Sequence, residues 1–465
     1  MLFNSFEFLA FFLPITLTVY FLLNNYGFDK PGKVWLLACS LFFYAWWKPI
    51  FLLLICTSMV INYFAGQKLN YIENPKTRKI FYITCLLGNL SVLLYYKYTN
   101  FIIDNVNLLL TEDIVIDKIA LPLAISFFTF QKFAYITDSY KGETKGYDFL
   151  NFCLFVTFFP QLIAGPIVHH KDIMPQFQDE SKKQFNTENF LKGLYIFLLG
   201  LIKKIAIADT FAIVANAGYG DATHLSFADS WITSIAYAVQ LYFDFSGYSD
   251  MAIGAGLLFN ITLPINFNSP YKATNLQDFW RRWHITLGNF LREYIYIPLG
   301  GNRKGELLTL NNLMITFLVG GIWHGANWTF LIWGFMHGFG LVVHRLWQKT
   351  KISIPDSVGL LITLLYVNFA WVFFRATSVG DALAVLKSMV GIGSVSYTGS
   401  KVLTDIYIYP TLLAGMFFLF LKNPPQLAKE FRFNTQHLLY MLGLTLIGLI
   451  YLNSITSNDF LYFDF

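Results

Sequence analysis

The sequence predicts an all-α, polytopic integral membrane protein, and three observations lead to that fold class. Only 13% of the 465 residues are charged, whereas 55% are hydrophobic and 19% are aromatic. Soluble domains carry about 25% charged residues, so this chain lacks the polar surface that a water-exposed protein needs. Apolar runs recur along the whole chain, and its mean hydropathy is +0.50. A soluble enzyme, a disordered protein and a nucleic-acid-binding protein are therefore poor candidates.

The lengths of the apolar runs set the number of membrane crossings. A helix perpendicular to the bilayer needs about 20 residues, and several runs are shorter, which is typical of tilted, broken or re-entrant helices. We expect about 11 to 14 transmembrane helices, with additional re-entrant or interfacial helices. The runs are Phe6–Leu23, Val34–Trp46, Phe51–Ala65, Ile80–Tyr96, Leu150–Ile167, Leu191–Ala208, Trp231–Gln240, Met251–Leu263, Leu307–Trp323, Trp328–Val343, Leu360–Phe374, Ile406–Leu421 and His437–Leu452.

A single domain covering residues 1–465 is the simplest organisation. No internal repeat aligns by inspection, and the sequence holds no Gly/Ser linker or low-complexity tract. The four cysteines lie in apolar stretches without C-x-x-C spacing, which predicts buried side chains and no metal site. The residues before the first apolar run include no Lys or Arg, so we expect that run to be a retained span rather than a cleaved signal.

Lys and Arg residues in short loops predict the orientation of the chain. The loop Gly66–Lys79 holds four basic residues against one acid and is expected in the cytoplasm. The segment Asp104–Lys118 holds four acids against one base and is expected outside. Further basic segments expected in the cytoplasm are Lys171–Lys183, Arg345–Lys351 and Lys422–Arg432. The tail Ser454–Phe465 has two acids and no base, so both termini are predicted to be extracytoplasmic.

The densest group of polar residues lies between Asn266 and Arg303. We expect a helix there with Asn275 as its N-cap. Arg281 and Arg282 follow Asp278 by three and four residues, so the three charges share a face. Facing lipid, they would cost on the order of 10 kcal/mol. The helix is therefore expected either at the membrane interface, with its charges paired, or against an aqueous cavity that binds a substrate.

Two histidines lie in tryptophan-rich polar surroundings, and we expect both in a pocket. His284 follows Trp280 by four residues, which would place both on one face of the predicted helix. His324 ends an apolar run shortly before Asn327, and neighbouring glycines allow a ligand or another backbone to approach closely. His337 lies in an otherwise apolar run, and we expect a structural role for it.

Other polar residues are expected to be structural or exposed. Asp244 and Asp250 lie in an aromatic, small-residue segment, so they must be paired or face a wet cavity. A proton pathway is one interpretation, and hydrogen bonding to Ser246, Ser249 or a neighbouring helix is the other. Exposed positions are expected for His169, His170, His224, His344 and His437.

No local motif identifies another catalytic site. The sequence contains no G-x-x-x-x-G-K-[ST], no H-E-x-x-H and no G-x-S-x-G. No Cys and His spacing typical of a metal site is present either.

An ordered set of motifs covers most of the chain. They are SLFFYAWWKP (Ser40–Pro49), LPLAISFFTFQ (Leu121–Gln131), FFPQLIAGPI (Phe158–Ile167), YFDFSGYSDMAIG (Tyr242–Gly254), DFWRRWHITL (Asp278–Leu287), YIPLGGNR (Tyr296–Arg303), GIWHGANW (Gly321–Trp328), WVFFRA (Trp371–Ala376) and FLYFDF (Phe460–Phe465). In this order the motifs resemble the membrane-bound O-acyltransferase family, and in particular its bacterial branch of alginate O-acetylation proteins and peptidoglycan O-acetyltransferases.

The resemblance implies a function and a location. It implies an acyltransferase with a central tunnel through the bilayer of the bacterial inner membrane. The donor would be acetyl-CoA or an acyl carrier thioester, with no bound cofactor. The acceptor would be an extracytoplasmic polysaccharide such as peptidoglycan or alginate, reached directly or through a periplasmic or surface acetyltransferase partner. The family's signature histidine corresponds to His324, and its second polar position corresponds to His284.

Ester formation from a thioester needs a base for the hydroxyl proton and stabilisation of the oxyanion. We assign His324 as the base, while His284 would orient a substrate or stabilise developing charge. Tryptophans would exclude water, and basic residues would bind the donor's phosphates. The residues expected to bind donor or substrate are Asp278, Trp280, Arg281, Arg282, Trp283, Trp323 and Asn327. Trp328 is a further tryptophan expected to exclude water, and Lys272 and Arg292 are further basic residues expected to bind phosphates.

Other functions remain open from the sequence. Some members of the family that the motifs resemble transfer D-alanine from a carrier protein to teichoic acid. A transporter or channel for a polymer or acyl group would use the same buried polar residues without chemistry. A scaffold for a secretion complex would leave the His324 pocket unexplained.

Overall fold

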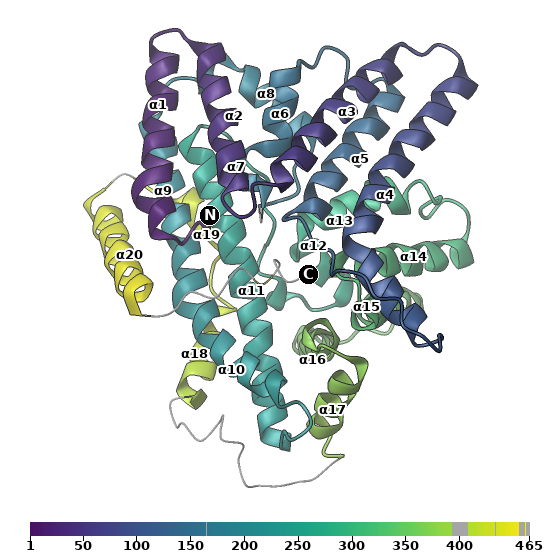
Figure 1. Cartoon of the computed structure of the whole chain (residues 1–465). Coiled ribbons are helices and arrows are strands. Elements are labelled where there is room, and N and C mark those ends of the chain that lie inside the picture. The colour runs from purple at the N-terminus through teal and green to yellow at the C-terminus, as the bar shows by residue number, and fades with distance from the viewer. Residues whose placement is uncertain (164, 393–407, 433, 455–460, 462–465) are drawn as a thin grey trace. The chain divides into compact units, whose positions relative to one another are not determined.

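All regular secondary structure in the part of the chain that the structure describes is helical (Figure 1). This computed structural model describes residues 1–163, 165–392, 408–432, 434–454 and 461. The predicted all-α fold is confirmed for these residues. The extracytoplasmic placement of the C-terminal tail and most of the FLYFDF motif concern residues outside the described ones.

The described residues include helices of the length and apolarity that a membrane crossing requires. Six helices meet both conditions, and the chain is a multi-pass membrane protein. They are Glu7–Asn25, Phe51–Tyr71, Pro75–Asn107, Glu306–His324, Asp356–Arg375 and Thr435–Leu452.

The chain divides into two compact units, and each consists of two segments of the sequence. Unit 1 is Met1–Phe197 with Asp250–Pro264. Its helices are η1 (Glu7–Phe12), α1 (Leu13–Asn25), α2 (Asp29–Ala45), α3 (Phe51–Tyr71), α4 (Pro75–Asn107), α5 (Ile125–Lys141), α6 (Phe149–Thr157), α7 (Phe159–Leu162), α8 (His170–Gln178), η2 (Glu180–Lys182), most of α9 (Thr187–Ile202) and the end of α11 (Phe227–Leu258).

Close helix packing in unit 1 depends on small residues. Gly193 of α9 faces Gly254 of α11, where a Cβ atom on Gly254 would lie 2.6 Å from the Gly193 carbonyl oxygen. A side chain at Gly254 would therefore push these two helices apart. Glycine pairs of this kind let helix backbones approach closely within membranes.

Unit 2 is Leu198–Ser249 with Ile265–Phe465. Its remaining helices are η3 (Lys203–Ala208), α10 (Asp209–Gly220), η4 (Pro270–Lys272), α12 (Leu276–Arg282), α13 (Ile285–Leu291), η5 (Arg292–Tyr296), α14 (Glu306–His324), α15 (Trp328–Thr350), α16 (Asp356–Arg375), α17 (Val379–Met389), α18 (Ile408–Phe418), α19 (Pro424–Glu430) and α20 (Thr435–Ser454).

The hairpin of α14 and α15 is packed through glycines, and it positions the candidate site. A Cβ atom on Gly321 would lie 2.4 Å from the Phe330 carbonyl oxygen, and one on Gly334 would lie 2.5 Å from the Phe317 carbonyl oxygen. In the turn between the two helices, the Asn327 side chain caps α15 by accepting a hydrogen bond from the Thr329 N–H at 3.0 Å.

A buried charge cluster lies in unit 2. The ammonium of Lys204 is 2.8 Å from Asp209 and 2.6 Å from Asp244, and each of the three side chains is at most 3% exposed. The prediction that Asp244 is paired is confirmed. Its ionic partner is Lys204 of η3, on a neighbouring segment, and it also accepts a hydrogen bond from the Leu461 N–H at 3.0 Å.

Replacing Lys204 with methionine is expected to destabilise the protein by about 3–5 kcal/mol, because two buried carboxylates would lose their shared cation. Thermal unfolding in detergent measures this loss. Adding Asp209→Asn and Asp244→Asn to Lys204→Met should recover part of it, because no buried charge is then left unpaired. An unchanged unfolding temperature in Lys204→Met would contradict the structural role of the cluster.

Candidate active site

The first candidate histidine, His284, is held by a side chain from the preceding loop. Asn275 caps α12 by accepting the Asp278 N–H at 2.9 Å, as predicted. The helix ends at Arg282, however, and His284 has the left-handed backbone angle φ +42°. The expectation that His284 shares a helix face with Trp280 is therefore wrong.

Asn266 sets the protonation pattern of the His284 ring. The Asn266 Oδ1 atom lies 3.0 Å from His284 Nδ1 and also accepts the Thr286 hydroxyl at 2.9 Å. Because a carbonyl oxygen only accepts, the neutral His284 ring carries its proton on Nδ1. Its Nε2 atom is buried and has no hydrogen-bond partner among the described residues. His284 thus keeps an unprotonated nitrogen that is able to accept a hydrogen bond from a hydroxyl group.

The second candidate histidine, His324, ends α14 and is enclosed by aromatic rings. Its ring centroid lies 4.9 Å from that of Trp323, 4.9 Å from Trp333 and 5.1 Å from Phe374. Gly325 follows it, and a Cβ atom there would lie 2.1 Å from the Phe330 ring, so the close turn after His324 requires glycine.

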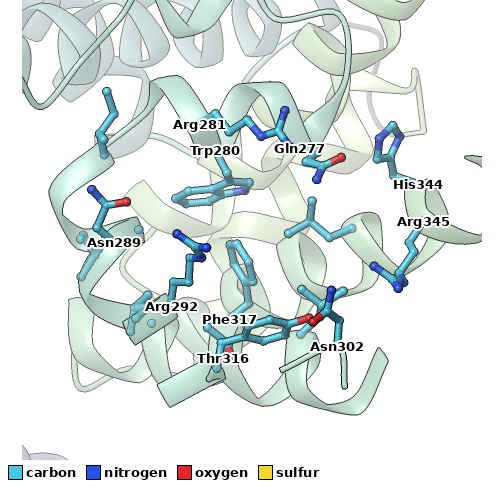
Figure 2. A pocket seen from close by; sticks show the side chains of 18 of the residues that line it. Gln277, Trp280, Arg281, Asn289, Arg292, Asn302, Thr316, Phe317, His344 and Arg345 are labelled. Atoms are coloured by element: carbon cyan, nitrogen blue, oxygen red, sulfur yellow. The ribbon is translucent and has the colours of Figure 1, made fainter. Parts of the chain in front are cut away.

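His324 lines a cavity of about 700 Å³ that lies entirely within unit 2. The cavity is bounded by residues of α12, α13, η5, α14 and α15. Along α14 its lining runs from Leu313 to His324, which corresponds to about 16 Å of helix. Figure 2 shows the polar and aromatic side chains that converge on this space. His324 thus lies at one end of the stretch of α14 that lines the cavity.

Two arginines give the cavity a positive charge. Arg281 and Arg292 both line it, and no carboxylate in the described part of the chain lies within ion-pair distance of either. A third arginine of the lining, Arg345, pairs with Glu306 at 3.2 Å. The two uncompensated guanidinium groups are suited to an anionic ligand.

The other predicted binding residues lie outside the lining of this cavity. Asp278 and Arg282 pair with each other at 2.9 Å, as their spacing predicted. Trp283 packs in a buried aromatic group, 4.9 Å from the Trp371 ring. Asn327 donates to the Thr377 carbonyl oxygen at 3.0 Å besides capping α15. These contacts give the four residues structural roles in the protein as it stands.

Trp323 lies between the two candidate histidines. Its ring centroid is 6.3 Å from that of His284 and 4.9 Å from that of His324. The structure therefore brings both histidines to the same indole ring, although they are forty positions apart in the sequence. Of the predicted site residues, His324, Trp280, Arg281 and Arg292 line the cavity, whereas His284 and Trp323 do not.

A family model for MBOAT, the membrane-bound O-acyltransferase family, matches residues 35–379. The chain belongs to this family. It is 44% identical to a peptidoglycan O-acetyltransferase of Helicobacter pylori, over 100% of this chain and 98% of that protein. It is 39% identical to a probable alginate O-acetylase AlgI of Pseudomonas aeruginosa, over 89% of this chain and 81% of that protein.

A third relative is more distant. The acyltransferase is 29% identical to a teichoic acid D-alanyltransferase of Streptococcus thermophilus, over 50% of this chain and 59% of that protein. Both the cavity and the two candidate histidines lie in the part of the chain that the family model covers.

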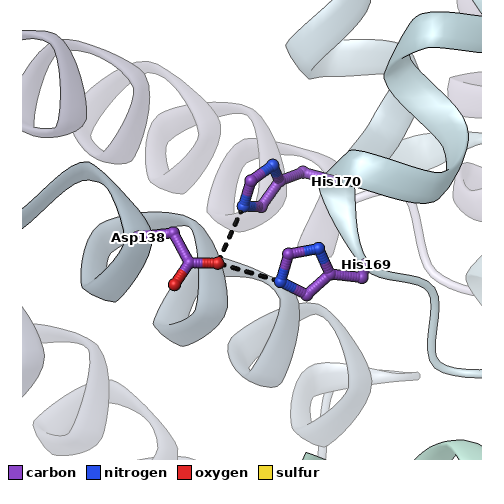
Figure 3. A group of neighbouring side chains, drawn as sticks. All are labelled: Asp138, His169 and His170. Atoms are coloured by element: carbon purple, nitrogen blue, oxygen red, sulfur yellow. Dashed lines mark hydrogen bonds and ion pairs between the residues drawn. The ribbon is translucent and has the colours of Figure 1, made fainter. Parts of the chain in front are cut away.

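The acyltransferase also contains a side-chain cluster in unit 1, formed by Asp138, His169 and His170, whose two histidines were expected to be exposed (Figure 3). His170 is fully buried, so its predicted exposure is wrong. The Asp138 Oδ2 atom lies 2.9 Å from His169 Nε2 and 3.0 Å from His170 Nε2. Asp138 precedes them by about thirty residues, on α5, and no local signal in the sequence connects the three.

The ligand atoms of this cluster lie within 4.8 Å of one another, and their types suit a metal ion. His169 Nδ1 accepts the Lys171 backbone N–H at 3.2 Å, so the proton of the neutral ring is on Nε2 and is donated to Asp138. In this arrangement the three side chains form a hydrogen-bonded clamp between α5 and the start of α8.

The clamp predicts a pH dependence of stability. Burial lowers the pKa of His170, and its hydrogen bond to Asp138 only partly opposes this shift. The pKa of Asp138 is also lowered, because hydrogen bonds from His169, His170 and Lys141 outweigh its burial. Other ionisable groups around the clamp are Tyr147, Lys171 and Glu143.

Neutral His170 contributes stability that is fully present above the ordinary histidine pKa of about 6.5, and it is lost as the pH falls towards the lowered pKa. The contribution of Asp138 is lost only below its ordinary pKa of about 3.9. The unfolding temperature is therefore expected to fall between about pH 6.5 and pH 5, and His170→Asn should reduce that slope. An equal slope in the two proteins would exclude His170 as its source.

Proposed function

We propose that the protein transfers acetyl groups from a cytoplasmic thioester donor to hydroxyl groups of an extracytoplasmic polysaccharide. The observation that carries the proposal is that one cavity holds both a buried histidine, His324, and two arginines without carboxylate partners in the described chain. Family membership supplies the acyl transfer. The peptidoglycan and alginate relatives, which match along most or all of the chain, support acetyl as the group and polysaccharide as the acceptor.

His324 acts as the general base and then as the general acid. Its imidazole takes the proton of the acceptor hydroxyl while the oxygen attacks the thioester carbonyl carbon. When the tetrahedral intermediate collapses, the carbon–sulfur bond breaks and the imidazolium returns the proton to the leaving thiolate. The products are an acetyl ester and a free thiol. General base catalysis of this kind contributes about 10²–10⁴-fold to the rate.

His284 orients the acceptor. The bond from Nδ1 to Asn266 fixes the ring, so Nε2 stays unprotonated, and Nε2 has no hydrogen-bond partner among the described residues. A hydroxyl group that donates to this nitrogen would be held near the aromatic wall that His284 shares with His324 through Trp323. Positioning of this kind lowers the entropic part of the barrier.

Arg281 and Arg292 bind the phosphates of the donor, which we propose to be acetyl-CoA. Both line the cavity, and guanidinium groups bind phosphate oxygens in bidentate geometry. Another residue of the lining, Arg345, lies in a basic segment for which the sequence predicts a cytoplasmic position. A charged thioester would therefore enter from the cytoplasm and place its acetyl end at His324.

The membrane arrangement follows the sequence expectation. We propose a single acyltransferase domain of residues 1–465 with about 11 to 14 transmembrane helices, re-entrant segments and a central tunnel in the bacterial inner membrane. Both termini are extracytoplasmic in this arrangement, as the distribution of basic residues predicts. The acetyl group leaves on the outer side, where the polysaccharide or a periplasmic acetyltransferase partner receives it.

Purified protein in detergent separates the proposal from its alternatives. With acetyl-CoA and a soluble oligosaccharide of the peptidoglycan glycan, we expect free CoA and an equal amount of acetyl ester. A transporter without chemistry would leave acetyl-CoA intact. Turnover of a D-alanyl carrier thioester in place of acetyl-CoA would identify the protein as a D-alanyltransferase, for which the partial match to the teichoic acid enzyme is the supporting observation.

A further inference from the structure

A third histidine, His337, is completely buried in α15. Its Nδ1 atom accepts the indole N–H of Trp280 at 3.2 Å. The indole nitrogen only donates, so the proton of the neutral His337 ring is on Nε2. That Nε2–H group is buried without an acceptor among the described residues. An apolar side chain would fill this space without leaving a buried donor unsatisfied. What the imidazole adds is the acceptor for Trp280.

The bond to His337 fixes the Trp280 indole, which forms part of the cavity wall. Its ring centroid lies 4.9 Å from that of Phe317 and 5.8 Å from that of Trp333, and all three residues line the cavity. Figure 2 shows the Trp280 indole next to the Phe317 ring. Trp280 belongs to α12, which is only seven residues long, and its bond to His337 ties this short helix to α15.

The Trp280 and Trp333 rings lie close to the proposed base, His324. Trp333 contacts Trp280 on one side and His324 on the other, where the ring centroids are 4.9 Å apart. His337 contacts both indoles, with centroids 4.9 Å from Trp280 and 4.9 Å from Trp333. The aromatic rings thus narrow the cavity where the acyl group of a donor would lie beside His324.

We propose that His337 is a positioning residue that holds Trp280 across the cavity and so restricts the acyl group to acetyl. The inference rests on the proposed function and deepens it, because it assigns the chain-length limit of the same site. If the indole is free to turn away, the space beside His324 lengthens. Longer acyl thioesters then fit, and water also gains access to the acetyl thioester.

The test compares His337→Leu, which removes the acceptor, with His337→Asn, whose Oδ1 atom retains one. The measurement is kcat/KM for acetyl-CoA and butyryl-CoA, together with the fraction of thioester that is hydrolysed rather than transferred. His337→Leu should raise the butyryl-to-acetyl ratio about tenfold or more, because acyl pockets discriminate by about this factor per methylene. His337→Asn should restore the wild-type ratio. An unchanged ratio in His337→Leu would overturn the inference.

Trp280→Phe tests the same hydrogen bond by removing its donor, which belongs to a partly exposed residue. It keeps an aromatic ring but loses the N–H donor, so it should reproduce the effect of His337→Leu even if the buried leucine variant folds poorly. The double variant should change the ratio no further than either single variant, because both remove one interaction. Additive changes would show that the two residues act separately.

The two proposals fail in different ways in this experiment. If wild-type protein does not consume acetyl-CoA, the proposed function fails. If wild-type protein transfers acetyl groups and all variants keep its acyl preference, only the role of His337 fails.

Discussion

Replacing His324 with alanine is expected to abolish acetyl transfer and leave the fold intact. The imidazole is the general base in our account, so its loss should lower kcat by about 10²–10⁴-fold. Because the ring is buried among Trp323, Trp333 and Phe374, the smaller side chain leaves a void, and a modest fall in unfolding temperature is expected as well. The measurement is acetyl ester formation by purified protein, with size-exclusion chromatography as the check on folding.

His224→Ala is the matched control for this prediction. The His224 side chain is 78% exposed and pairs with Asp221 three residues earlier, so its removal should leave both rate and stability unchanged. Transfer at the wild-type rate in a folded His324→Ala variant would remove His324 from the mechanism.

Replacing Arg281 or Arg292 with alanine is expected to raise the KM for acetyl-CoA about tenfold or more. A hydrogen bond to a charged group contributes about 1.5–3 kcal/mol, and about 1.4 kcal/mol corresponds to a factor of ten in affinity. The same variants should change the KM for acetyl-pantetheine little, because that thioester lacks the phosphates. Steady-state kinetics with the two donors separates phosphate binding from a general loss of activity.

Arg282→Ala provides the control, since Arg282 is adjacent in sequence but pairs with Asp278 and does not line the cavity. Its effect on the KM for acetyl-CoA should be small. Equal changes in KM for both donors in Arg281→Ala and Arg292→Ala would contradict the assignment of these residues to the phosphates.

Features governed by local spacing were predictable from the sequence. Asn275 caps α12, and Asp278 pairs with Arg282 one turn later, as positional rules for helices require. The all-α fold follows equally from the lack of charge and the recurrence of apolar runs. In each case the interacting residues are at most a few positions apart or the signal is averaged over the whole chain.

Features that depend on distant contacts were not predictable in this way. His284 leaves the helix of Trp280 because Asn266, eighteen positions earlier, holds its ring. His170 is buried because Asp138 accepts from it across thirty-two positions, and Lys204 of η3 provides the cation for Asp244. His344 was expected to be a surface residue but contributes to the lining of the cavity. One sequence carries no local signal for such pairs.

The central claim is that the protein moves an acetyl group from a thioester on one side of the membrane to a hydroxyl group on the other. Reconstitution into sealed vesicles tests it, with acetyl-CoA outside and a glycan oligosaccharide enclosed. Among molecules whose cytoplasmic face is outward, we expect acetyl ester on the enclosed glycan, and no ester with His324→Ala. Intact acetyl-CoA in wild-type vesicles, or equal ester with His324→Ala, would contradict the account.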